Sequence, residues 1–225
     1  DMASRNFGEP GDDGEYTNHL LNFELQKQLG NNWKVEASYV YVDQDLSTRS
    51  TSGWPYFPTD SIDEEGNPVA AGTLYRETFG YPDKKSQSHQ LSALLHGDFM
   101  TGNVNHLMTI GIDFSKSERE GDFGWAVTHD SDYGSPFNIY HPRYGLYNEP
   151  IEIQSTDISE AKNLGVFVND TLYLSEELIF NAGLRYDDVN SNYKEIYTDG
   201  SDTYSDNGNE SDISWHTGLL YKQRP

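Results

Sequence analysis

The sequence has 225 residues and a mass of 25.5 kDa, with 15 Lys and Arg against 37 Asp and Glu, so its formal charge is −22. This charge excludes nucleic acid as a partner, because few cations are available to neutralise phosphates, and it argues against attraction to an anionic membrane surface. The absence of Cys excludes disulfides and thiolate chemistry. Aromatic residues make up 13% of the chain, too many for a disordered acidic segment.

Hydrophobic residues recur with a period of two along most of the chain. In 33–41 the side chains of Trp, Val, Ala and Tyr at every second position alternate with mostly polar ones, and the same alternation recurs in 107–115 and 178–186. Alternation of this kind gives each strand one apolar and one polar face. The pattern predicts an all-β fold with about seven long strands, at 16–29, 33–45, 86–101, 105–118, 156–174, 177–190 and 211–222.

The connections between these strands alternate in length. Short connections rich in Gly, Asn and Ser are expected at 30–32, 102–104 and 175–176, and long ones at 46–85, 119–155 and 191–210. The order predicts an antiparallel up-and-down meander with all tight turns at one end and all long loops at the other. A transmembrane β-barrel has this asymmetry. A soluble β-sandwich is the alternative, although its strands are usually shorter.

Five stretches resemble the TonB-dependent siderophore receptor family, in the family's order. They are NFGEP at 6–10, LGNNWKV at 29–35, HPRYG at 141–145, the strand pair GVFVND and AGLRYD at 165–170 and 182–187, and WHTGLLYK at 215–222. The resemblance implies a bacterial outer-membrane barrel of about 22 strands, with short periplasmic turns, long extracellular loops and an internal plug. It also implies uptake of ferric siderophores, driven by TonB through an N-terminal box.

The chain departs from the family pattern, because it contains no plug, no TonB box and too few strands to close such a barrel. We therefore expect residues 1–225 to be one partial barrel domain, from the middle of the barrel. TonB would contact only parts of the receptor that are absent from this chain. We further expect contact with outer-membrane lipid, and self-association of the isolated segment through its open sheet edges.

The sequence gives little support for catalysis, so we expect no enzyme, no catalytic residue and no cofactor. His89 and His96 fall on opposite faces of a strand, which favours polar lining over a metal site. The acidic segments 199–202 and 206–212 are rich in oxygen ligands but lack the EF-hand spacing, which favours solvated loops over calcium sites.

Aromatic residues in the long loops are the candidates for ligand binding. A receptor for an iron chelate must grip the organic shell, for which rings supply stacking surface and Arg supplies charge attraction. Loop packing is the alternative role for each of them. The candidate ligand-binding residues are Trp54, Tyr56, Phe57, Trp125, His129, Tyr140, Arg143 and Tyr144.

Two functions follow from these observations. The first is a segment of an outer-membrane siderophore receptor that supplies barrel wall and extracellular binding loops. The second is a soluble, secreted, acidic β-sheet module that binds a carbohydrate or a protein partner through the same rings.

Overall fold

The computed structural model describes residues 8–63, 66–126, 135–145 and 150–223. In this part of the chain every regular element is a strand, and no helix is long and apolar enough to cross a membrane. The strands are β1 (Asp13–Leu29), β2 (Trp33–Phe57), β3 (Ser61–Ile62), β4 (Pro68–Val69), β5 (Thr73–Thr101), β6 (Val104–Ala126), β7 (Ser135–Asn138), β8 (Ile151–Tyr173), β9 (Leu178–Tyr197) and β10 (Tyr204–Tyr221).

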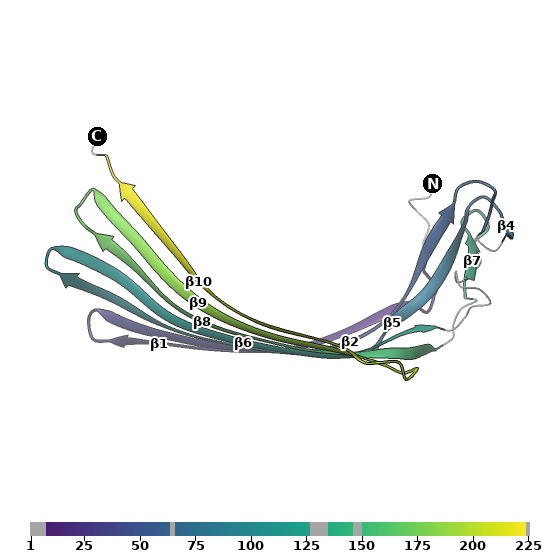
Figure 1. Cartoon of the computed structure of the whole chain (residues 1–225), viewed down its shortest axis with the longest axis horizontal. Helices are drawn as coiled ribbons and strands as arrows, with labels where there is room; N and C mark the ends of the chain where they lie inside the picture. Colours follow the sequence, from purple (N-terminus) through teal and green to yellow (C-terminus); the bar gives the residue numbers. More distant parts are fainter. Residues whose placement is uncertain (1–7, 64–65, 127–134, 146–149, 224–225) are drawn as a thin grey trace.

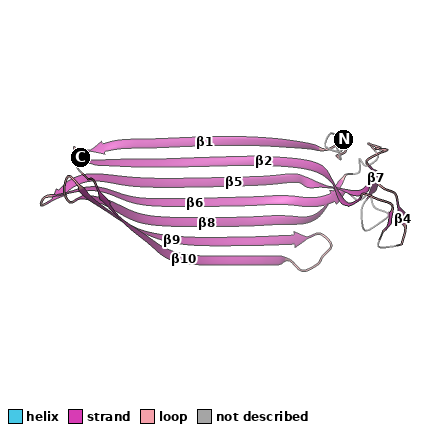
Figure 2. Cartoon of the chain, turned by 90° about the horizontal axis from the view of Figure 1, so that it is seen from above, coloured by secondary structure: helices cyan, strands magenta, loops and turns pink. Residues whose placement is uncertain are grey.

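Seven long strands form one antiparallel sheet in the order β1-β2-β5-β6-β8-β9-β10, which follows the chain without a crossover. Figure 2 shows them side by side, and Figure 1 shows that the sheet is strongly curved. β7 pairs with the start of β5, and β3 and β4 form a separate small hairpin. The predicted meander is confirmed, and the sheet does not close into a barrel within this chain.

The tight turns lie at one end of the sheet, and β4 and β7 lie at the other (Figure 1). Gly30 and Gly102 have φ angles of 74° and 62° in two of these turns, a backbone conformation that favours glycine. These turns lie at the predicted positions.

At the end of the sheet opposite the tight turns, the strand boundaries predicted from the sequence were wrong, because the strands are longer than expected. Strands extend into both ends of the loops expected at 46–85, 119–155 and 191–210, so the connections shrink to 58–72, 127–150 and 198–203. The reason is that apolar and polar residues no longer alternate regularly at this end, because polar residues occur on both faces of the sheet. Backbone pairing continues there without an alternation of hydrophobicity to indicate it.

One face of the sheet, here called the outward face, carries a continuous apolar band. The register aligns Leu25, Ala37, Ala93, Ile112, Val166, Tyr186 and Ile213 in one row across all seven strands. On β5 the band runs from Leu91 to Phe99, about 26 Å along the strand at 3.3 Å per residue. For a strand tilted by about 40° this gives a height of about 20 Å, close to the apolar height of a membrane barrel, about 25 Å. Charged residues within the band are Lys27, Asp170 and Asp188.

The inward face at the same height is polar and cross-linked by side chains. Arg185 donates hydrogen bonds to Asp113 at 2.9 Å for each of two contacts, and also bonds to Asp187. Its guanidinium passes over Gly165, where an added Cβ would collide with both Arg185 and Asp113. The missing side chain on β8 therefore lets β9 reach β6.

The described residues contain only one small apolar core, at the end opposite the tight turns. Leu74, Phe137 and Ile139 are each less than 5% exposed and pack together with Tyr56. Outward side chains of the band are much more exposed, for example Ile112 at 46% and Trp215 at 73%. The sheet is thus a wall that needs another medium to cover its apolar face.

Candidate functional site

An aromatic cluster lies on the inward face of β5 and β6, beyond the apolar band. The Trp125 ring centroid is 5.3 Å from that of Phe79 and 5.5 Å from that of Phe123, and Tyr81 is 5.3 Å from Phe123. The Lys84 ammonium lies 3.8 Å from the centroid of the Tyr81 ring. We call these five residues the inward aromatic cluster.

Backbone irregularities place these rings together. The pairing of β5 with β6 shifts register between Gly80 and Asp83, and the pairing of β6 with β8 shifts at Gly124. A Cβ at Gly124 would collide with the Glu152 carbonyl oxygen. Bulges of this kind bend a strand and re-aim its side chains. Here they bring rings from four positions onto one face.

Lys84 supplies the positive charge of the cluster. Burial lowers the pKa of Lys84, the neighbouring Arg119 lowers it further, and Asp157 opposes the shift. The cation is therefore half-buried against an aromatic face, an arrangement that attracts anions in a partly desolvated place.

Three tyrosines and a carboxylate continue this surface onto β8, β9 and β10. The Tyr193 hydroxyl donates a hydrogen bond to Asp157 at 3.0 Å, and the Tyr193 and Tyr204 rings are 6.0 Å apart. Burial, followed by the hydrogen bond to Asp157, raises the pKa of Tyr193 to about 12. Tyr197 bonds to Glu195 at 2.8 Å. These three tyrosines were not among the predicted ligand-binding residues, and they lie in strands where a loop was expected at 191–210.

A buried ion pair fixes the small core beside this surface. Arg76 contacts Glu9, and their side chains are 1% and 0% exposed. The Arg76 guanidinium carbon lies 4.0 Å from the centre of the Phe137 ring, and Glu9 accepts a hydrogen bond of 2.6 Å from the Gly145 amide. Glu9 lies before β1 and was quoted as part of the NFGEP stretch, so its contacts join the segment before β1 to β5 and to the connection between β6 and β8. Sequence reasoning quoted that stretch but assigned Glu9 no role.

Most of the predicted ligand-binding residues that can be placed also pack against neighbours. Phe57 meets Tyr75 edge to face at 6.1 Å, and Tyr144 lies 5.4 Å from Phe137. Burial and the adjacent Tyr140 raise the pKa of Tyr56, whose ring packs on the apolar core. Trp125 belongs to the inward aromatic cluster, on a strand and not in the predicted loop.

Other predicted residues are more exposed or are not described. Tyr140 is 53% exposed, and Arg143 is exposed and has no ion pair within the described residues. Trp54 lies in β2, but its side chain is outside the described part, and His129 lies outside the described residues altogether. The ligand role of the predicted set remains a prediction.

The two histidines on β5 face opposite sides, as predicted, and each has protein partners. His89 is hydrogen-bonded to the Tyr39 hydroxyl at 2.9 Å, and His96 to Thr109 at 3.1 Å. No group of three metal-ligating side chains occurs within the described ranges. Segment 206–212 is part of β10, so its interpretation as a loop was wrong, whereas Asp199 in the remaining loop bonds to Ser201.

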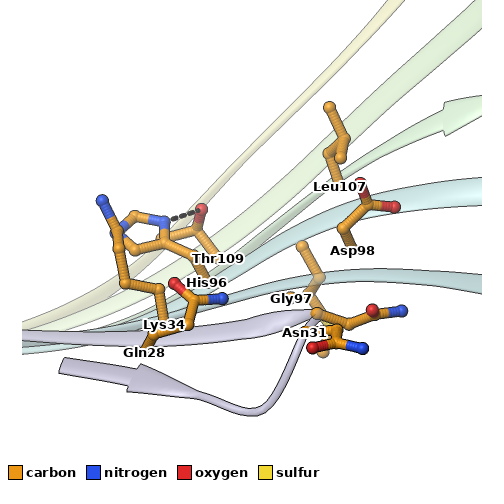
Figure 3. A pocket seen from close by; sticks show the side chains of 10 residues that line it. Gln28, Asn31, Lys34, His96, Gly97, Asp98, Leu107 and Thr109 are labelled. Carbon is orange, nitrogen blue, oxygen red and sulfur yellow. Dashed lines mark hydrogen bonds between the residues drawn. The ribbon is translucent and has the colours of Figure 1, made fainter.

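A pocket of about 310 Å³ opens at the opposite end of the sheet, beside the tight turns. Figure 3 shows Lys34, His96 and Thr109 on the strands that line it, with Asn31 in the adjoining turn. Lys34 and His96 both contact Glu36, the latter at 3.6 Å. Lys34 and His96 are therefore already paired with Glu36, and the pocket lies far along the strands from the inward aromatic cluster.

Comparison with known proteins assigns the family. The family model described as TonB dependent receptor-like, beta-barrel matches residues 2–225. This chain belongs to the TonB-dependent receptor β-barrel family. The apolar outward face and polar inward face are the two faces of a barrel wall.

Curated relatives of this TonB-dependent receptor segment are receptors. The ferrioxamine B receptor of Salmonella typhimurium is 22% identical over 208 residues, 90% of this chain and 26% of that protein. The metal-pseudopaline receptor CntO of Pseudomonas aeruginosa is 24% identical over 185 residues, 82% of this chain and 24% of that protein. The chain therefore spans about a quarter of the length of these relatives.

Solved structures show the same fold. The ferric-catecholate import receptor Fiu of E. coli aligns with a TM-score of 0.71 and 14% identity, over 96% of this chain and 35% of that one. The siderophore receptor PiuA of Acinetobacter baumannii aligns with a TM-score of 0.69 and 16% identity, over 95% of this chain and 31% of that one. At these identities the likeness concerns the fold alone.

Proposed function

We propose that this chain is a wall segment of an outer-membrane receptor that takes up ferric siderophores with energy from TonB. The observation that supports this most strongly is the family match over nearly the whole chain, on a sheet with one apolar and one polar face. The relatives are named as receptors for ferrioxamine B and for metal-pseudopaline, which supports a metal chelate as the ligand. TonB would engage parts of the receptor outside this segment.

The exposed apolar band argues against the soluble, secreted alternative. Leu25, Ile112 and Leu184 lie in this band and are each about half exposed, at 51%, 46% and 51%. A face of this size on a water-soluble protein would promote aggregation. In a membrane the same face is covered by lipid tails, and the polar inward face borders the lumen.

The chelate would bind at the loop end of the lumen, against the inward aromatic cluster. Trp125 and Tyr81 offer ring faces for an organic chelate, and Lys84 offers a cation that is already partly desolvated. The exposed side chains of Tyr140 and Arg143 would close over the ligand from the second long connection. The role is transport, and no reaction is assigned to these residues.

The test is binding of a panel of ferric complexes (ferrioxamine B, catecholate and citrate) to cells that express the full-length receptor. The variant is Trp125→Ala, and the matched control is Trp215→Ala, the same change on the outward face. We expect up to about tenfold weaker binding for Trp125→Ala, because a stacked ring contributes about 0.5–1.5 kcal/mol beyond burial. Trp215→Ala should bind normally. Equal affinities at equal surface expression would assign Trp125 to packing alone.

A further inference from the structure

Charge is separated by strand along one row of the inward face, beside the inward aromatic cluster. Arg119 on β6 lies on this face one row nearer the tight turns. The row itself crosses five strands, β5, β6, β8, β9 and β10, and its register partners are Lys84, Gly121, Asp157, Glu195 and Tyr204. The inward face here is therefore positive at β5 and β6 and negative at β8 and β9.

The two carboxylates of the row bind tyrosine hydroxyls, and neither forms an ion pair within the described residues. Asp157 accepts a hydrogen bond from Tyr193 at 3.0 Å, and Glu195 accepts one from Tyr197 at 2.8 Å. Each bond uses one carboxylate oxygen, so the second oxygen can accept from another donor. Lys84 lies near enough for its charge to interact with that of Asp157, whereas Glu195 is one strand further away.

Tyrosine rings line the negative half of this surface. The Tyr193 and Tyr204 ring centroids are 6.0 Å apart at an interplanar angle of 59°, and Tyr204 is 53% exposed. Burial, the hydrogen bond to Asp157 and the charge of Glu195 raise the pKa of Tyr193, which shows that the negative charges act on this ring. The face of an aromatic ring attracts cations. The rings and carboxylates together therefore form a surface for a cation.

We propose that Tyr193, Tyr204, Asp157 and Glu195 bind a cationic group of the chelate, so that the receptor prefers chelates with an ammonium arm. We call these four residues the arm subsite. The arm subsite rests on the proposed function, since it requires the head of the chelate to lie against the inward aromatic cluster. Three strand spacings of about 4.8 Å separate β5 from β9, so the arm would reach about 14 Å across the wall.

Repulsion on the other half of the surface supports the same orientation. Lys84 and Arg119 would repel an ammonium group from β5 and β6, where the aromatic cluster holds the head. Specific sites commonly combine attraction in one place with repulsion in another. A chelate that is negative on all sides would instead place one side against Asp157 and Glu195. The wall therefore favours a dipolar chelate, with an aromatic or anionic head and a cationic arm.

The test compares two ferric probes with the same head on cells that express the full-length receptor. Ferrioxamine B ends in an ammonium group, and N-acetylferrioxamine B lacks that charge. The variant is Asp157→Asn/Glu195→Gln, and the matched control Asp83→Asn/Glu120→Gln removes the same charges from the outward face at a similar height.

We expect the wild type and the control to bind ferrioxamine B about tenfold more tightly than its acetylated form, because two partly exposed charge contacts contribute about this much. The variant should bind both probes alike, with its affinity for N-acetylferrioxamine B unchanged. Tyr204→Leu removes one ring and keeps both carboxylates, so the preference should fall by about two- to fivefold.

Several outcomes would overturn the arm subsite. Equal affinity of the wild type for the two probes would exclude it, as would a preference that persists in Asp157→Asn/Glu195→Gln. Weaker binding of both probes by that variant would assign the carboxylates to packing of the wall. A wild type that binds ferric citrate or a ferric catecholate but neither probe refutes only the arm subsite. A wild type that binds no ferric complex refutes the proposed function as well.

Discussion

Replacing Glu9 by Gln should open the small core at the long connections without unfolding the sheet. The variant keeps the shape of the side chain but leaves the Arg76 guanidinium, 1% exposed, without its counter-charge. Removing one partner of a buried ion pair costs about 3–5 kcal/mol. Because this pair joins the residues before β1 to β5, its loss should destabilise the small core at the long connections and not the rest of the sheet. At about 3 kcal/mol the local opening equilibrium rises roughly 150-fold.

Hydrogen exchange of the full-length receptor in detergent measures this opening. The Gly72 amide donates to the Phe57 carbonyl at 2.7 Å, and the Ile139 amide to the Gly72 carbonyl at 2.8 Å, so both report on the core. We expect both amides to exchange faster in Glu9→Gln, while amides of β6 around Ile112 keep their protection.

A second variant separates the loss of the pair from the uncompensated charge. Glu9→Gln/Arg76→Met removes both charges, and replacing a buried pair by neutral side chains is often tolerated. We expect this double variant to recover much of the lost protection. Unchanged exchange at Gly72 and Ile139 in Glu9→Gln would refute the reasoning, as would an equal loss of protection at Ile112.

Three further predictions concern other parts of the wall. Gly165→Ala should destabilise the receptor by about 1–3 kcal/mol in thermal unfolding, because the new Cβ displaces Arg185 from Asp113. The control Gly218→Ala should unfold as the wild type does, because no atom lies within 4 Å of its added Cβ. Tyr193 should ionise near pH 12, so its contribution to stability is present below about pH 10 and is lost between about pH 10 and 12. In an ultraviolet titration, the ionisation of Tyr193 should move to lower pH in Asp157→Asn and disappear in Tyr193→Phe. Residues 1–225 expressed alone should self-associate or require detergent, because β1 and β10 leave unpaired edges; a sharp monomeric peak by light scattering in plain buffer would contradict this.

The sequence was sufficient to predict the sheet where its two faces differ. Alternation in 107–115 placed Ile110 and Ile112 on one face, and the Gly-Asn turns defined the meander. The pattern disappears beyond Lys116, where Glu118 and Arg119 are both polar although they face opposite sides. The strands continue there through backbone pairing, which residue types alone do not indicate.

The candidate site was only partly predictable for a related reason. Trp125 was found as one of several rings in an expected loop. Its partner Phe79 also lies in an expected loop, at 46–85, and only the pairing of β5 with β6 shows that the two rings meet. The contact between Glu9 and Arg76 depends on how the segment directly before β1 packs against the end of the sheet. No local spacing in the sequence encodes that packing.

The central claim is that this sheet is a membrane wall with its apolar face toward lipid, and spin labels along β6 test it most directly. The sequence contains no Cys, so single-Cys variants from Leu107 to Ser117, omitting the crowded Gly111, each give one label in this segment. In the full-length receptor in lipid vesicles, we predict that oxygen accessibility peaks at even positions such as Ile110 and Ile112. A water-soluble nickel chelate should instead reach odd positions such as Ser115. The account would be contradicted if the accessibilities to oxygen and to the nickel chelate peaked at the same positions along β6, or if the nickel chelate reached the even positions more easily than the odd ones.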